Sequence, residues 1–179
     1  LIALGQFTYK ITIPAEDLKK IQTFTDLYDY IEQHQASEWK VISEKEIKKL
    51  IPQREPFIML DGFEERDDKS AVTTLSVCPN NYFILPDDTM AETGLIEHLA
   101  QSCSALAGWQ AQSQALDHPP VGLIGEVKHF ECHRRPQIGE QVRSTVTFSF
   151  TFANTTLATG QAFVGEELIA DIQLKIFMQ

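Results

Sequence analysis

The chain has 179 residues, of which 43% are hydrophobic and 22% are charged, a composition that is ordinary for a soluble globular protein. It carries 25 acidic and 15 basic residues, for a formal net charge of −10. That balance argues against nucleic-acid binding, which needs clustered lysine and arginine to neutralise phosphates. No apolar run reaches the roughly 20 residues that a membrane-spanning helix requires.

The three cysteines, Cys78, Cys103 and Cys132, cannot all pair, and their spacing matches no zinc motif. They indicate a reduced, cytoplasmic protein. His129 and His133 flank Cys132, but alternation along a strand points the cysteine away from both histidines. We therefore predict no metal site here, only surface and core residues at the end of a strand.

Two short helices are predicted in the first part of the chain, at residues 15–21 and 25–34. The second has apolar residues at helical spacing and Thr23 or Thr25 as a plausible N-cap. Residues 37–44 are expected to be a linker, which separates this helical segment from a larger domain.

The larger domain begins with a short amphipathic helix at residues 44–51. Extended runs follow at 57–65 and 70–78. A long helix is predicted from 92 to 115, with Thr89 as its capping residue because Glu92 follows three positions later, as in a capping box. One side of this helix is apolar, and much of the remainder is small, which lets a curved sheet wrap closely around it.

Strands complete the chain, at residues 121–130, 142–152, 157–164 and 168–177. In the second of them, apolar and polar residues alternate with a period of two, and its phenylalanines are expected to supply bulk to the inner face of the sheet: Phe148, Phe150 and Phe152. Antiparallel strands around one central helix form an α+β layering, and the order of elements matches the hot-dog fold.

Three motifs, in order, carry a family resemblance. Residues 50–61 read Leu-Ile-Pro-Gln-Arg-Glu-Pro-Phe-Ile-Met-Leu-Asp, residues 94–101 read Gly-Leu-Ile-Glu-His-Leu-Ala-Gln, and residues 128–140 contain Arg-Pro-Gln-Ile-Gly-Glu. Together they resemble the bacterial 3-hydroxyacyl-carrier-protein dehydratases. The Pro-Pro-Val-Gly at 119–122 is shared with dehydratase-like proteins of bacterial aryl polyene pigment pathways.

This resemblance implies roles for particular positions. Glu97 would be the catalytic carboxylate that acts on the leaving hydroxyl group. The backbone N–H of Gly94, at the start of the helix, would polarise the thioester carbonyl. The expected substrate-binding residues are Phe57, Phe83, Leu95, His98 and Gln101. The basic pair Arg134 and Arg135 is expected to receive a phosphate or an acidic helix of the carrier protein.

One part of the family pattern is absent from this sequence. The family carries a base histidine in a Gly-His-Phe-Pro-Gly-type loop, but residues 80–88 contain no histidine, and Gln53 replaces the histidine of the opening motif. General-base catalysis typically contributes about 10²–10⁴-fold. His98 points about 100° away from Glu97 on the helix, whereas His129 or His133 could reach the site of a partner subunit.

Residues 1–36 have a second resemblance, to the last half of an acyl carrier protein. The match rests on Ile-Thr-Ile-Pro at 11–14 and Asp-Leu-Tyr-Asp-Tyr-Ile at 26–31. The carrier's phosphopantetheine serine would lie upstream of Leu1, so the expected domains are 1–36 carrier-like, 37–44 linker and 45–179 dehydratase-like. The alternative is an unrelated helical extension. No cofactor is expected in the hot-dog domain itself.

Three functions follow from these observations. The first is dehydration of 3-hydroxyacyl thioesters on an acyl carrier protein to trans-2-enoyl thioesters, in fatty-acid or polyene biosynthesis, by a homodimer or a heterodimer with another hot-dog protein. The second is a catalytically incomplete subunit that binds acyl-carrier intermediates or pairs with an active dehydratase. The third is a thioesterase, which the dehydratase-like motifs disfavour.

Overall fold

The computed structural model describes residues 44–114 and 122–178, together with residues 17, 19–21, 23 and 26. The chain divides into two compact units, residues 1–40 and 41–179. Within the described residues, no helix has both the length and the apolar character needed to cross a membrane.

In the first unit, the described residues include one helix-start arrangement. The backbone N–H of Asp26 donates to the Thr23 hydroxyl at 3.1 Å, and the N–H of Thr23 donates to the Asp26 carboxylate at 2.8 Å. This reciprocal pair is a capping box and agrees with the N-cap predicted at Thr23. The remainder of the carrier-like segment 1–36, and the linker before Glu44, lie outside the described residues, so both stay predictions.

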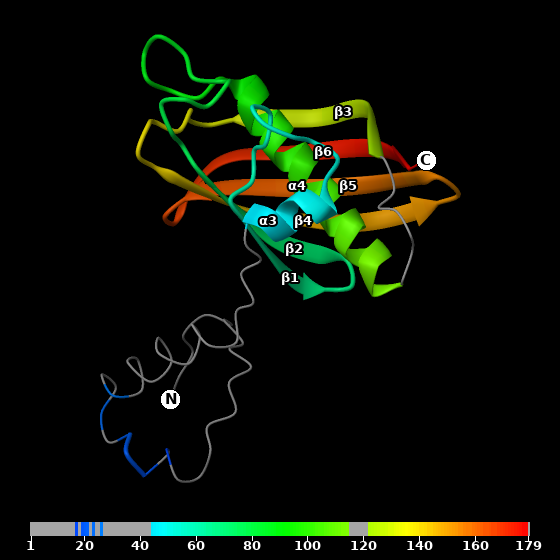
Figure 1. Ribbon diagram of the computed structural model, residues 1–179, viewed down its shortest axis with the longest axis horizontal. Helices are drawn as coiled ribbons and strands as arrows, with labels where there is room; N and C mark the ends of the chain where they lie inside the picture. Colours follow the sequence, from blue (N-terminus) through cyan, green and yellow to red (C-terminus); the bar gives the residue numbers. More distant parts are fainter. Residues whose placement is uncertain are drawn as a thin grey trace. The chain divides into compact units, whose positions relative to one another are not determined.

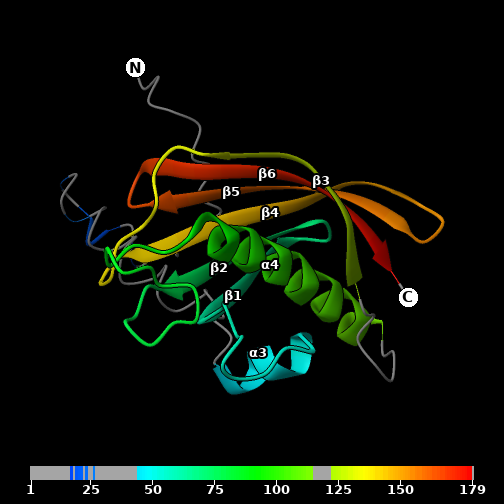
Figure 2. The same ribbon diagram turned by 90° about the horizontal axis from the view of Figure 1, so that it is seen from above.

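The second unit contains one six-stranded antiparallel sheet, in the order β1-β2-β4-β5-β6-β3, and a long helix that crosses one face of it (Figures 1 and 2). We call the face toward this helix the inner face. The elements are α3 (Glu44–Leu50), β1 (Gly62–Asp67), β2 (Ser70–Ser76), α4 (Glu92–Ser113), β3 (Gly122–Cys132), β4 (Gln141–Phe152), β5 (Thr155–Val164) and β6 (Glu167–Met178). The predicted hot-dog architecture is confirmed.

Small residues let α4 lie close to its neighbours. A Cβ atom on Gly108 would stand 2.0 Å from the carbonyl oxygen of Leu50, so the last turn of α3 packs directly against the backbone of α4. A Cβ atom on Gly160 of β5 would stand 3.0 Å from a methyl group of Leu99. Larger side chains at these positions would separate the layers.

The alternation predicted for β4 holds over only part of the strand. Phe148 is buried, but Phe150 is 59% exposed and Phe152 is 73% exposed. The register of β4 against β5 shifts between Phe148 and Phe150, and such a bulge changes the face on which the following side chains lie. The expectation that all three phenylalanines supply the inner face was therefore wrong for two of them.

Two boundaries also differ from the prediction. The N-cap of α4 is Ala91, without a side-chain hydrogen bond, because the Thr89 hydroxyl donates to Asp87 at 2.6 Å instead. The first strand begins at Gly62 and not at residue 57. The backbone at Phe57 and Met59 is hydrogen-bonded to side chains of α4, so it does not join the sheet.

Candidate active site

A pocket of about 110 Å³ lies between α4 and the strands near one edge of the sheet. Glu97 is on its wall, and the helix positions that share this wall recur every three to four residues, as expected for one face of a helix. The lining residues are Gln53, Glu97, Ala100, Cys103, Ser104, Ala107, Gly122, Ile124, Phe148 and Ile176. The pocket therefore offers a carboxylate beside an otherwise mostly apolar channel.

Gln101 holds the Glu97 carboxylate in place. Its side-chain nitrogen donates to Glu97 Oε1 at 2.7 Å and to the Phe57 carbonyl at 2.6 Å, and its oxygen accepts the Met59 N–H at 2.8 Å. Gln101 is fully buried, and every hydrogen-bonding atom of its amide is used. It can position the carboxylate, and because it is fully buried it presents no surface to a substrate.

Gln53 faces the same pocket with an unused acceptor. Its side-chain oxygen is buried and accepts no hydrogen bond from any residue that the structure describes. Buried polar atoms are nearly always paired, so this unpaired oxygen of a pocket-lining residue is a candidate partner for a bound molecule once the side chain turns toward the pocket. Gln53 was not predicted from the sequence as a site residue. The signal that could have identified it is that Gln53 replaces the family histidine in the opening motif.

His98 lies in the core and does not line the pocket. Its ring is fully buried; Nδ1 is 2.7 Å from the Met59 carbonyl oxygen and Nε2 is 2.9 Å from the Ser144 hydroxyl. Burial lowers the pKa of His98 from 6.5 to about 4. A neutral ring that donates from Nδ1 and accepts at Nε2 satisfies both partners, so His98 joins α4 to two other segments and has no contact to offer a substrate.

The predicted residues at the start of α4 also serve packing. Leu95 is fully buried in the core. The backbone N–H of Gly94 donates to the Ala91 carbonyl at 2.9 Å. A Cβ atom on Gly94 would stand 2.6 Å from Cβ of Phe83, so the close approach that this glycine allows is to Phe83 of the same chain. Of the predicted substrate-binding residues, Phe57 is 46% exposed, and its ring packs at a tilt against that of Tyr82, with the ring centroids 4.8 Å apart.

Cys103 and Ser104 bring a thiol and a hydroxyl to the pocket. Burial raises the pKa of the Cys103 thiol to about 12. A thiol with that pKa stays protonated at neutral pH and is a poor nucleophile. No described histidine or carboxylate is hydrogen-bonded to Ser104. The arrangement therefore favours acid–base chemistry by Glu97 over attack by a nucleophilic side chain.

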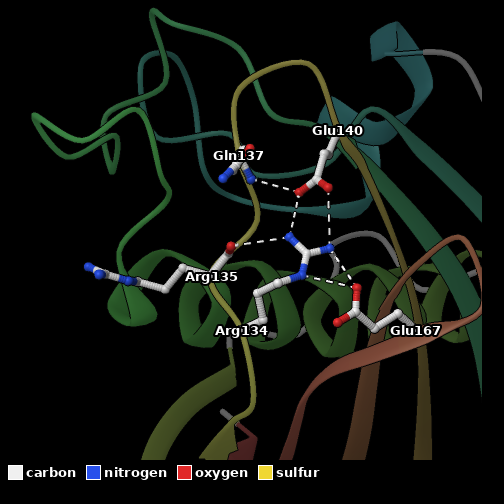
Figure 3. A network of polar contacts seen from close by, with 5 residues as sticks. All are labelled: Arg134, Arg135, Gln137, Glu140 and Glu167. Atoms are coloured by element: carbon white, nitrogen blue, oxygen red, sulfur yellow. Dashed lines mark hydrogen bonds and ion pairs between the residues drawn. The ribbon is translucent and has the colours of Figure 1, made fainter.

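The two arginines predicted to dock the carrier protein differ in whether their guanidinium groups already bind residues of this chain. The guanidinium of Arg134 makes hydrogen bonds of 2.8 and 3.2 Å to Glu140 and of 3.0 and 2.9 Å to Glu167 (Figure 3). These bonds lower the pKa of Glu140 and tie the loop after β3 to the start of β6. Arg134 is thus committed within the chain. Arg135 is 3.4 Å from Asp87, and its side chain is 41% exposed.

The remaining described histidines, His129 and His133, lie on the side of the sheet away from the pocket. Phe130 and Cys132 pack against the core, and alternation along β3 places the neighbouring side chains on the outer face. Within one chain, neither histidine reaches Glu97.

Comparisons with known proteins identify the family of this chain. Residues 45–179 match the family model described as ApeP-like, ApeP dehydratase. The 3-hydroxyacyl-[acyl-carrier-protein] dehydratase FabZ of Clostridioides difficile is 30% identical over 134 residues, covering 72% of this chain and 92% of the relative. The FabZ of Actinobacillus pleuropneumoniae is 29% identical, covering 80% and 96%.

Solved structures share the fold at low identity. The dehydratase heterocomplex ApeI:P from Xenorhabdus doucetiae superposes with a TM-score of 0.70 at 13% identity, covering 74% of this chain and 90% of that one. A hypothetical thioesterase from Streptococcus pneumoniae gives 0.54 at 10% identity, covering 65% and 84%. With its dehydratase motifs, its hot-dog fold and this family match, the chain belongs to the ApeP-like dehydratase family.

Proposed function

We propose that this chain supplies the acidic half of a dehydratase site that converts 3-hydroxyacyl thioesters on an acyl carrier protein to trans-2-enoyl thioesters. The observation that carries the proposal is the Glu97 carboxylate, held by Gln101 on the wall of a mostly apolar pocket. The curated FabZ relatives carry this activity in their names.

In this reaction, a base removes a proton from the α-carbon, the bond between the β-carbon and its hydroxyl oxygen breaks, and the double bond forms between the two carbons. The hydroxyl group leaves as water after it receives a proton from Glu97. Gln53 has a free acceptor on the same pocket wall, which suits the hydroxyl proton of the bound substrate. Gln101 fixes the direction in which the carboxylate points.

The apolar part of the pocket suits the acyl chain. Ala100, Ser104 and Ala107 follow Glu97 along one face of α4, and Phe148 and Ile176 close the opposite side. The ten steps along the helix from Glu97 to Ala107 span about 15 Å, at 1.5 Å per residue. An extended acyl chain can lie along this face with its 3-hydroxyl group at Glu97.

We assign the base to a partner hot-dog protein. The segment between β2 and α4 contains no histidine, and the described histidines of this chain face the core or the outer side of the sheet. β3 is an edge strand, and Leu123, Ile124 and Val127 on it are 41–48% exposed. Because Ile124 also lines the pocket, a partner on this edge would stand beside Glu97. The dehydratase neighbour is itself a heterocomplex.

The carrier-like resemblance of residues 1–36 supports an acyl carrier protein as the substrate-bearing partner, and tethering would raise the local concentration of the acyl chain. The phosphopantetheine arm would be carried on a serine of the carrier. With Arg134 committed to Glu140 and Glu167, Arg135 is the arginine of the pair that we assign to docking.

The test is conversion of a 3-hydroxyacyl carrier protein to its enoyl form, followed by mass spectrometry. The assay contains this chain alone, or this chain with a hot-dog protein that has an intact histidine loop and is encoded beside it. Turnover that needs both proteins is the expected result. Turnover by this chain alone would support the dehydratase activity and overturn the proposal that a partner supplies the base. No turnover from the pair, with the complex formed, would overturn the dehydratase proposal.

A separate prediction concerns Gln53. Replacing it with leucine removes the orphan acceptor, so the Michaelis constant for the 3-hydroxyacyl substrate should rise by about tenfold, the effect of one lost hydrogen bond of about 1.4 kcal/mol. Gln53→Glu keeps an acceptor and should lose less. Steady-state kinetics of the active enzyme measures both variants, and equal kinetics for Gln53→Leu and the unmodified chain would remove Gln53 from the site.

A further inference from the structure

Four metal-binding side chains meet on the outer face of the sheet, where β3 ends against β6. His129 and Glu131 lie on β3, Asp171 lies on β6, and His133 follows β3 directly. Phe130 and Cys132 of the same segment pack inward. Cys132, which was considered as a metal ligand in the sequence analysis, therefore lies on the inner face. Two carboxylates, and not this thiol, lie beside the histidines on the outer face.

The two carboxylates occupy an unfavourable position unless a cation accompanies them. Glu131 and Asp171 are direct partners in the β3–β6 ladder, and like charges directly opposite each other destabilise a sheet. The formal net charge of −10 adds to this cost. If the four side chains bind a metal ion, the arrangement is more than a set of ion pairs.

The spacing of the donor atoms fits a small divalent cation. His129 Nε2 and His133 Nε2 each lie 3.3 Å from a different oxygen of Asp171, His133 Nδ1 lies 3.6 Å from Glu131 Oε1, and His129 Nε2 lies 4.0 Å from Glu131 Oε2. Zinc bonds of about 2.0–2.2 Å to nitrogen and oxygen place neighbouring tetrahedral donors about 3.3–3.6 Å apart. One donor atom from each of His129, Glu131 and Asp171 lies within 4.8 Å of the other two. His133, which can offer only one of its two ring nitrogens to the same ion, is the candidate for the fourth ligand.

We propose that His129, His133, Glu131 and Asp171 form a zinc site that fastens the edge strand β3 to β6 on the outer face. Two imidazoles and two carboxylates are a ligand set that zinc accepts. The site is separate from the Glu97 pocket, which opens on the inner face. Its role would be structural, because fixing β3 holds the edge strand whose Gly122 and Ile124 line that pocket.

The competing explanation is a cluster of ion pairs with protonated histidines and no metal. The side chains are partly exposed, at 49% for His129, 36% for His133, 59% for Glu131 and 29% for Asp171, so water can reach them all. Ion pairs alone would leave the stability of the chain unchanged when a chelator or zinc is added. A zinc site would lose stability with the chelator and regain it with zinc, because metal binding is coupled to folding. The two explanations therefore predict different responses to metal.

The experiment uses the untagged full chain, stripped with a chelator and titrated with zinc chloride by calorimetry near neutral pH. A single zinc ion per chain should bind, raise the thermal midpoint and be released at acid pH. Loss of a group that only hydrogen-bonds to a metal ligand weakens metal sites by about 10–100-fold. His129→Gln and Asp171→Asn remove a ligand itself, so each should weaken binding at least that much.

Two matched variants serve as controls. Glu126→Gln removes an exposed carboxylate from the same strand but outside the cluster, and Cys78→Ser removes the exposed free thiol. Both should bind zinc as the unmodified chain does. The proposal is overturned if zinc does not bind, if Cys78→Ser abolishes binding, or if His129→Gln and Asp171→Asn leave it unchanged. Stability that responds neither to the chelator nor to zinc would identify the ion-pair cluster.

Discussion

Replacing Glu97 with glutamine should lower kcat for dehydration by about 10²–10⁴-fold, the usual contribution of a general acid or base. The amide keeps the size of the side chain, and its oxygen can still accept the hydrogen bond from Gln101. It cannot deliver a proton to the leaving hydroxyl group. The expected loss is therefore in kcat, with the fold and the Michaelis constant little changed. The measurement is the steady-state rate of dehydration, made with the partner protein present if activity requires it.

Glu92→Gln is the matched control for this prediction. Glu92 lies in the first turn of the same helix and is exposed, so the same chemical change outside the pocket should leave kcat within about twofold, because exposed substitutions rarely exceed about 0.5 kcal/mol. If Glu97→Gln and Glu92→Gln had equal activity, the carboxylate on the pocket wall would not be the acid. Thermal unfolding of both variants separates lost chemistry from lost folding.

Local patterns were sufficient to predict most of the architecture. The run of apolar and small residues between 92 and 113 defined α4, and the period of two in β4 placed Phe148 on the inner face, where it lines the pocket. These signals come from neighbours in the sequence, and the structure bears them out. The bulge after Phe148 was not visible in the pattern, because a bulge is set by how β5 pairs with β4.

The site was only partly predictable for a similar reason. Glu97 could be placed because it belongs to a motif. The roles of Gln101 and His98 depend on residues about 40 positions away: Gln101 binds the backbone at Phe57 and Met59, and His98 binds the Met59 carbonyl and Ser144. Such long-range partners leave no trace in helical periodicity. A polar side chain that helical periodicity places on the substrate side can instead have all its hydrogen-bond partners within the chain.

Arg134 shows the same limit for charged residues. Its place in a short basic run suggested a docking surface, yet Glu140, in the loop before β4, and Glu167, at the start of β6, both bind its guanidinium (Figure 3). Glu140 is close in sequence, and the pairing could have been proposed. Glu167 is 33 positions away, and only the turn between β5 and β6 brings it into contact.

The buried His98 should make the stability of the hot-dog unit depend on pH. Its pKa is about 4 in the folded chain, against the ordinary 6.5. Above about pH 6.5 the ring is neutral in both states, so it adds no pH dependence. As the pH falls from there toward 4, the unfolded chain binds a proton that the folded chain does not bind. Stability is therefore lost across this window, by up to about 3 kcal/mol, and the loss from His98 levels off below pH 4.

Urea unfolding followed by circular dichroism at about pH 7 and about pH 4.5 measures this loss, and His98→Asn identifies its source. Asparagine can still donate to the Met59 carbonyl but does not titrate, so the difference in unfolding free energy between the two pH values should shrink by about 2–3 kcal/mol. Ser102→Ala is the control, because this buried hydroxyl bonds to Thr73 and to the His98 carbonyl. It should lower stability by a similar amount at both pH values. A pH dependence that is the same in His98→Asn and in the unmodified chain would mean that carboxylates, and not this histidine, govern acid unfolding.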